Sequence, residues 1–204
     1  MADKTSVCNI AISHVGISKE IGDVDTERSV EASTCRRFYE TTLKEAMRDF
    51  PMPFTVVTEA LALVTDLREV STAEWSFSYR YPSGCMKALR IPSGNRNDDK
   101  SSRVSYKISS DAQGRLIYTD QENALLEFVQ YDDDPDRWPE DFLMSFSLLL
   151  AFYIAPRVTA GDPYKLGDRA FRNYLLSISK ARANAVGEEQ QDEQPESEFI
   201  TSRN

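Results

Sequence analysis

The sequence predicts an α+β fold, composed of a mainly α-helical bundle with a small inserted antiparallel β lobe and an extended C-terminal tail. Apolar residues recur at helical spacing in residues 5–49 and 138–187, and the pattern changes to alternation between them. Residues 188–204 are acidic and poor in apolar side chains. Helices from both ends of the chain must pack together to bury their apolar faces. We therefore assign residues 1–70 and 138–187 to the bundle, 71–137 to the β lobe and 188–204 to the tail.

The composition is that of a globular chain with one main core. Of 204 residues, 41% are hydrophobic and 28% are charged. The net charge is −9, of which residues 188–204 contribute −5. The chain has no dense block of lysine and arginine, which argues against tight nucleic-acid binding by a single copy. Cys8, Cys35 and Cys85 are odd in number and lack metal-ligand spacing, so we expect reduced, buried thiols.

The first segment predicts two helices. Residues 5–16 have apolar side chains at helical spacing. A longer helix is expected over residues 26–49, with Asp25 or Thr26 as its N-cap. The prolines of "PMP" at 51–53 end it, because proline lacks the amide proton that a helix interior needs.

The middle of the chain changes from helical to alternating spacing. Residues 54–64, "FTVVTEALALV", are interpreted as a short helix or turn. The next stretch, "WSFSYRY", places four aromatic residues on one face of a strand: Trp75, Phe77, Tyr79 and Tyr81. These rings could stack on bases or sugars, but packing in a core is the better explanation of a half-buried strand.

A hairpin and one more strand complete the expected sheet. The segments "VSYKIS" and "RLIYTD" are joined by a turn in which Gly114 suits a hairpin. The segment "ALLEFVQY" provides the last strand.

Two helices are expected after the β lobe. Pro139 starts the first, whose apolar run "FLMSFSLLLAFYIA" is shorter than the ~20 residues that cross a bilayer, so we expect a buried helix. The last helix begins with Asp162 as cap and Pro163 just inside, and Gly187 can end it. Its expected buried residues are Leu166, Ala170, Tyr174, Leu175 and Ile178.

The sequence shows little that supports catalysis. His14 is the single histidine and lies in a predicted helix, so a catalytic triad is not expected. The acidic run "DDDPD" at 132–136 lacks the glycine bend and distal glutamate of a calcium loop, which favours a helix-capping turn. The glycines do not form a phosphate-binding loop. We therefore expect no catalytic, cofactor-binding or metal-binding residues, and a folded body with an acidic tail is typical of an assembly component.

The order of the segments resembles the podophage tail tubular protein A family, the head-to-tail adaptors beneath the portal. The family opens with an "A-L-x-x-I-G" helix, followed by a loop rich in "I" and "D". A long helix then carries "A-x-x-C-x-x-x-Y" and ends in "L-R-x-x-P-W-x-F-A". Matching positions here are Ala11, Gly16, Ile21, Asp25, Ala32, Cys35, Tyr39, Arg48, Pro51 and Phe54. Met52 stands where the family commonly has tryptophan.

The β segment carries a second part of the resemblance. "EWSFSYRYPSGCMKALRI" is similar to the family's "W-x-Y-x-Y-x-x-P-x-D-C-L-K-x-x-x-I", with Gly84 in place of a common aspartate. The matching residues are Trp75, Tyr79, Tyr81, Pro82, Cys85 and Lys87. The segment "WPEDFLMSFSLLLAFYIAPRVTAGDPYKLG" also resembles the family's helix pair, so the similarity extends over most of residues 8–187.

The resemblance implies a structural virion protein of the phage neck, assembled in the host cytoplasm. Twelve copies would form a ring bound to the portal protein above and to a tail nozzle or other tail proteins below. DNA would pass through the centre without sequence-specific binding, and no membrane would be involved. A mildly acidic channel wall suits this role, because DNA slides past it rather than adhering.

The resemblance also implies that the acidic tail binds a neighbouring subunit or the portal. Phe199 and Ile200 are the large apolar residues of the tail, and so are its expected anchors. Glu196, Glu198 and Arg203 would set the register of the contact.

Two other functions remain open at this stage. One is a tail-associated polysaccharide-degrading enzyme that uses two carboxylates. The other is a soluble scaffolding or assembly chaperone. Release of reducing sugars would identify the enzyme, and absence from purified virions would identify the chaperone.

Overall fold

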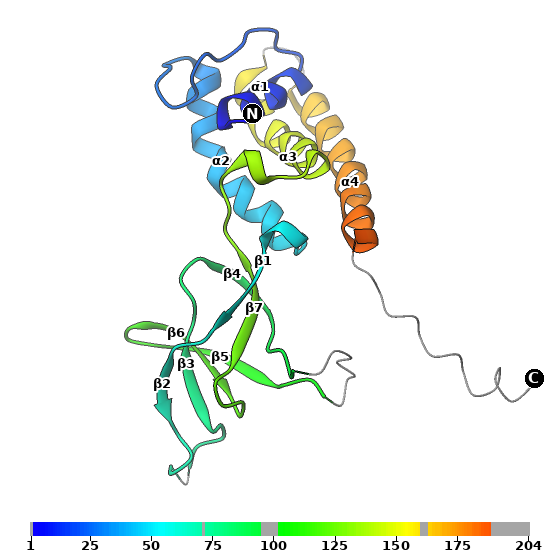
Figure 1. The fold of residues 1–204 in the computed structure, drawn as a ribbon. Helices are drawn as coiled ribbons and strands as arrows, with labels where there is room; N and C mark the ends of the chain where they lie inside the picture. The colour runs from blue at the N-terminus through cyan, green and yellow to red at the C-terminus, as the bar shows by residue number, and fades with distance from the viewer. Residues whose placement is uncertain (1, 71, 95–101, 160–162, 189–204) are drawn as a thin grey trace, which may run out of the picture.

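The computed structural model describes residues 2–70, 72–94, 102–159 and 163–188. Within these ranges the chain has four α-helices and seven antiparallel strands in two sheets, with 46% helix and 22% strand. Figure 1 shows a helical part and a β part joined end to end. The prediction of a mainly helical bundle with a small β lobe is therefore wrong, because the β part has two sheets and its own core. The fold is α+β.

The elements follow one another with short connections. The helices are α1 (Lys4–His14), α2 (Val30–Asp49), α3 (Glu140–Val158) and α4 (Pro163–Glu188). The strands are β1 (Val56–Ala60), β2 (Leu63–Asp66), β3 (Phe77–Arg80), β4 (Cys85–Arg90), β5 (Tyr106–Asp111), β6 (Gly114–Thr119) and β7 (Leu125–Gln130). Single 3₁₀ turns, Pro53–Thr55 and Pro135–Arg137, precede β1 and α3.

The largest error of the sequence-based prediction concerns residues 54–64. After the 3₁₀ turn that ends at Thr55, they form β1 and the first half of β2 rather than a helix or turn. β1 pairs with β7, with Val56 opposite Val129, and β2 pairs with β3. Both strands lie before residue 70, in the segment that we had assigned to the bundle.

Helix α2 begins later than the sequence suggested. Its N-cap is Ser29, whose hydroxyl accepts a hydrogen bond from the amide of Ala32 at 3.2 Å. The expected caps belong to a separate turn instead. The carboxylate of Asp23 accepts from the amide of Asp25 at 2.9 Å and from the hydroxyl of Thr26 at 2.6 Å. These local bonds compete with the helix for the same residues.

The two sheets have the strand orders β1-β7-β4 and β2-β3-β6-β5. The β5–β6 hairpin is confirmed, with Asp111 opposite Gly114 and a φ of 134° at that glycine. Apolar side chains from both sheets form the β core: Phe77, Tyr79, Ile91, Ile117, Leu126 and Phe128.

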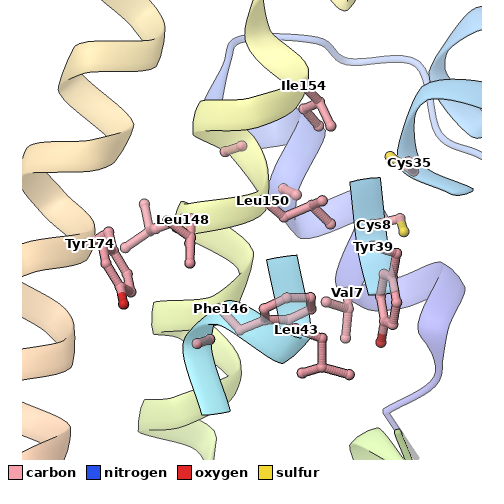
Figure 2. Packing of buried hydrophobic residues seen from close by; sticks show 14 of the residues in the cluster. Val7, Cys8, Cys35, Tyr39, Leu43, Phe146, Leu148, Leu150, Ile154 and Tyr174 are labelled. Carbon is pink, nitrogen blue, oxygen red and sulfur yellow. The ribbon is translucent and has the colours of Figure 1, made fainter. Parts of the chain in front are cut away.

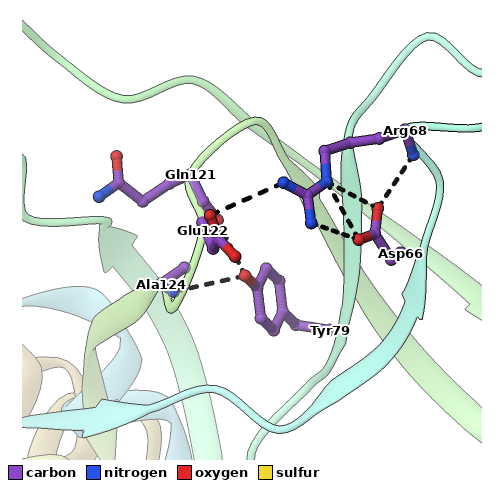
Figure 3. Close-up of polar contacts among 6 residues, drawn as sticks. All are labelled: Asp66, Arg68, Tyr79, Gln121, Glu122 and Ala124. Atoms are coloured by element: carbon purple, nitrogen blue, oxygen red, sulfur yellow. Dashed lines mark hydrogen bonds and ion pairs between the residues drawn. The ribbon is translucent and has the colours of Figure 1, made fainter.

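Polar contacts connect β2 and β3 to the loop before β7 (Figure 3). The hydroxyl of Tyr79 donates to the carbonyl of Gln121 at 2.9 Å. The guanidinium of Arg68 binds the carboxylate of Asp66, with its shortest contact at 2.6 Å, and lies 3.8 Å from Glu122. This network holds together segments that are far apart in the sequence.

The core of the helical part is centred on α3, which packs against α1, α2 and α4. Phe146 and Leu150 of α3 lie among Val7, Tyr39 and Leu43 of the first two helices (Figure 2). By length and composition alone, α3 could also cross a membrane, with a mean hydropathy of 1.4. Because 56% of that window is buried among the other helices, its packing is that of a core helix.

Candidate assembly surfaces

His14 lies at the end of α1, beside α3 and α4. Its Nε2 is 3.5 Å from the hydroxyl of Ser147, and burial lowers the pKa of the imidazole below its usual value. The ring lines an open hollow of about 320 Å³ together with Arg169 and Asn173 of α4. In the described part of the chain, no group of three histidine, cysteine or carboxylate side chains is placed to hold a metal ion.

The acidic run at 132–136 forms a capped turn, as predicted. Asp134 is the N-cap of the 3₁₀ turn, and its carboxylate accepts from the amide of Asp136 at 3.3 Å. Arg137 binds Asp134 at 3.1 Å and Asp132 at 3.5 Å. The carboxylates of Asp132 and Asp134 therefore have partners within the turn.

The aromatic residues of the predicted strand serve mainly as core. Phe77 and Tyr79 are buried, which confirms core packing for these two rings. Trp75 and Tyr81 are half-buried at the ends of the strand. The rings thus do not form a flat exposed platform on which bases or sugars could stack.

The cysteines follow the prediction in part. Cys8 and Cys35 are free and buried, whereas Cys85 is half-buried. A hydrogen bond with Cys35, together with burial, raises the pKa of the Cys8 thiol. The same hydrogen bond lowers the pKa of the Cys35 thiol. Because both thiols are buried, packing explains the pair better than catalysis, which needs an accessible thiolate.

The most unusual surface of the described chain is the outer side of α4. Five of the twelve exposed large apolar side chains belong to this helix: Tyr164, Phe171, Leu175, Leu176 and Val186. Tyr164 is 76% exposed and Leu176 is 66% exposed. Leu175 was expected to be buried, but that prediction is wrong, because it is 50% exposed. Clusters of exposed apolar residues of this kind mark interaction surfaces.

The same helix carries a concentration of positive charge. Residues 163–188 hold five bases and two acids, a net charge of +3 in a chain of −9. Four of the bases recur with Leu176 at intervals of three or four positions and share one helix face. We call this face the α4 ridge: Lys165, Arg169, Arg172, Leu176 and Lys180. All five side chains are exposed.

An apolar stripe runs beside the ridge and consists of Tyr164, Phe171 and Leu175. Phe171 contacts Phe152 of α3, with ring centroids 4.9 Å apart, which anchors the stripe to the bundle. The sequence prediction of a buried side is confirmed at Ala170, Tyr174 and Ile178, but it did not single out the bases or the apolar stripe on the exposed side. The orientation of α4 follows from its packing on α3.

The site residues predicted from the sequence all fall in the C-terminal tail. Phe199, Ile200, Glu196, Glu198 and Arg203 lie outside the described residues, so their contacts remain a prediction. The predicted cap Asp162 also lies outside them.

Comparisons with known proteins do not identify a family. A scan against protein families found no match, and a search of curated proteins found no similar sequence.

Proposed function

We propose that this protein is a structural virion protein, a head-to-tail adaptor that forms a ring beneath the portal. Twelve copies join the portal to the tail, and the ring forms part of the channel through which DNA is ejected. The observation that carries the proposal is the outer face of α4, which combines exposed apolar side chains with clustered positive charge in a single chain. A subunit of a closed ring needs such a surface for its neighbour.

The two-part architecture supports the same role. The helical part and the β part have separate hydrophobic cores and lie at opposite ends of the molecule (Figure 1). The β part also has exposed apolar residues, such as Leu63 and Val64 of the edge strand β2. A subunit with two differently built ends can bind one partner at each end.

The direct test is to mix the purified protein with isolated portal rings and image the product by electron microscopy. We expect a second ring of density on one face of the portal, and co-sedimentation of the two proteins. Portal that remains bare at saturating protein would contradict the proposal. Mass analysis of purified virions adds a second criterion, because a chaperone would be absent from them and an adaptor present in portal stoichiometry.

A further inference from the structure

The α4 ridge is a basic surface on an otherwise acidic body. Arg169, Arg172 and Lys180 form no ion pair with any residue in the described ranges. By contrast, Arg182 of the same helix binds Asp49 of α2. The ridge therefore has charge that the described part of its own chain does not neutralise.

The chain contains one segment whose chemistry matches this surface. Residues 189–204 hold five acids and one base, and include Phe199 and Ile200. Carboxylates suit the arginines of the ridge, and large apolar side chains suit Leu176 and the adjacent apolar stripe. Glu196 and Glu198 directly precede the apolar pair, so carboxylates and large apolar side chains lie close together in the sequence. Duplex DNA would match the positive charge but not the apolar stripe.

The length of this segment is also sufficient. Sixteen residues can span ~50 Å when extended, whereas α4, with 26 residues, is ~39 Å long. The segment can therefore follow the whole ridge. Helix α4 continues past Gly187 to Glu188, so this segment begins at the C-terminal end of the helix, beyond the ridge. To bind its own ridge the segment would have to reverse direction, whereas the ridge of another copy requires no reversal.

We propose that residues 189–204 of one copy bind the α4 ridge and apolar stripe of a neighbouring copy. Phe199 and Ile200 pack on Leu176 and Leu175, while the glutamates pair with Arg169 and Arg172. The inference rests on the proposed ring, in which a neighbour's ridge lies within reach. It gives the ring an interface that is made by a different surface on each of the two copies.

The contact can be tested without the portal. A fluorescent peptide of residues 188–204 is titrated into a chain truncated after Glu188, and binding is followed by anisotropy. We expect saturable binding that weakens as salt is added. The ridge variant Arg169→Glu/Arg172→Glu should weaken binding by about tenfold or more, because both ion pairs become repulsive. A matched control, Arg37→Glu/Arg48→Glu, makes the same charge change at exposed positions of α2 and should bind normally.

Two further measurements determine which partner binds the α4 ridge. A Phe199→Ser/Ile200→Ser peptide keeps every charge and should lose most of its affinity. This loss would distinguish a specific contact from non-specific electrostatic attraction. The full-length chain, diluted until it is monomeric, should bind the peptide about as well as the truncated chain. If its ridge is blocked instead, the tail lies on its own helix and the proposal is overturned. Binding of duplex DNA but not of the peptide would also overturn it.

These outcomes separate this inference from the proposed function. Rings that form on the portal although the peptide does not bind would reject the tail contact alone. Peptide binding without any association with the portal would reject the adaptor function and leave the contact between copies.

Discussion

Helices α3 and α4 lie side by side, but the described residues cover α3 on most sides and α4 on only one. α3 packs against three helices and buries ten of its 19 residues. α4 is longer and packs mainly against α3, leaving its ridge and apolar stripe exposed. Apolar residues in α3 are thus explained by the stability of the single chain. Those on the outer side of α4 are not, which is why we attribute them to association between copies.

The largest expected effect tests the role of α3 as the core. Phe146 is fully buried, with ring centroids 5.2 Å from Tyr39 and 5.4 Å from Trp138. Phe146→Ala should lower the free energy of unfolding by about 3–5 kcal/mol, because it leaves a cavity that the helices cannot close. Urea denaturation followed by circular dichroism measures the loss. Met144→Ala, at an exposed position of the same helix, should change it by less than about 0.5 kcal/mol.

A smaller effect of opposite sign tests the contact between the two helices. Gly167 lies inside α4, and a Cβ there would be 3.6 Å from Cβ of Ala155 and from Phe152, an ordinary packing distance. Gly167→Ala should therefore stabilise the protein by about 0.5–1 kcal/mol, since alanine has the better helix propensity. The melting temperature would rise by a few degrees. A fall would mean that the helices pack more closely than these distances indicate.

A pH-dependent effect tests the junction of α1, α3 and α4. Burial lowers the pKa of His14, so the folded state binds its proton less readily than the unfolded state does. Stability should therefore decline as pH falls from about 6.5 through the lowered pKa, and should not depend on this group above that range. His14→Gln should flatten the pH profile of the unfolding free energy between about pH 5 and 7. An identical profile in both proteins would show that folding does not change the pKa of His14.

Elements with a local sequence signal could be predicted, whereas elements that depend on a distant partner could not. Helix α3 and the β5–β6 hairpin follow local signals, namely a continuous apolar run and a glycine turn. β1 could not be identified in this way, because short runs of valine, threonine and alanine fit both the helical spacing and the alternating spacing of a strand. Its conformation depends on pairing with β7, which lies about 70 residues further along the chain. The buried side of α4 was predicted correctly at Ala170, Tyr174 and Ile178, but not at Leu175, because the width of the buried face of a helix is set by the partner on which it packs.

The smallest expected effect is the sharpest test of the contrast between α3 and α4. Leu176→Ala removes a large apolar side chain that is 66% exposed, so unfolding of the monomer should change by less than about 0.5 kcal/mol. Leu149→Ala makes the same change at a buried position of α3 and should cost about 2–5 kcal/mol. Both are measured by urea denaturation at dilute protein concentration. A similar cost at the two positions would mean that the chain itself covers Leu176 in solution, and α4 would then have no free face for a partner.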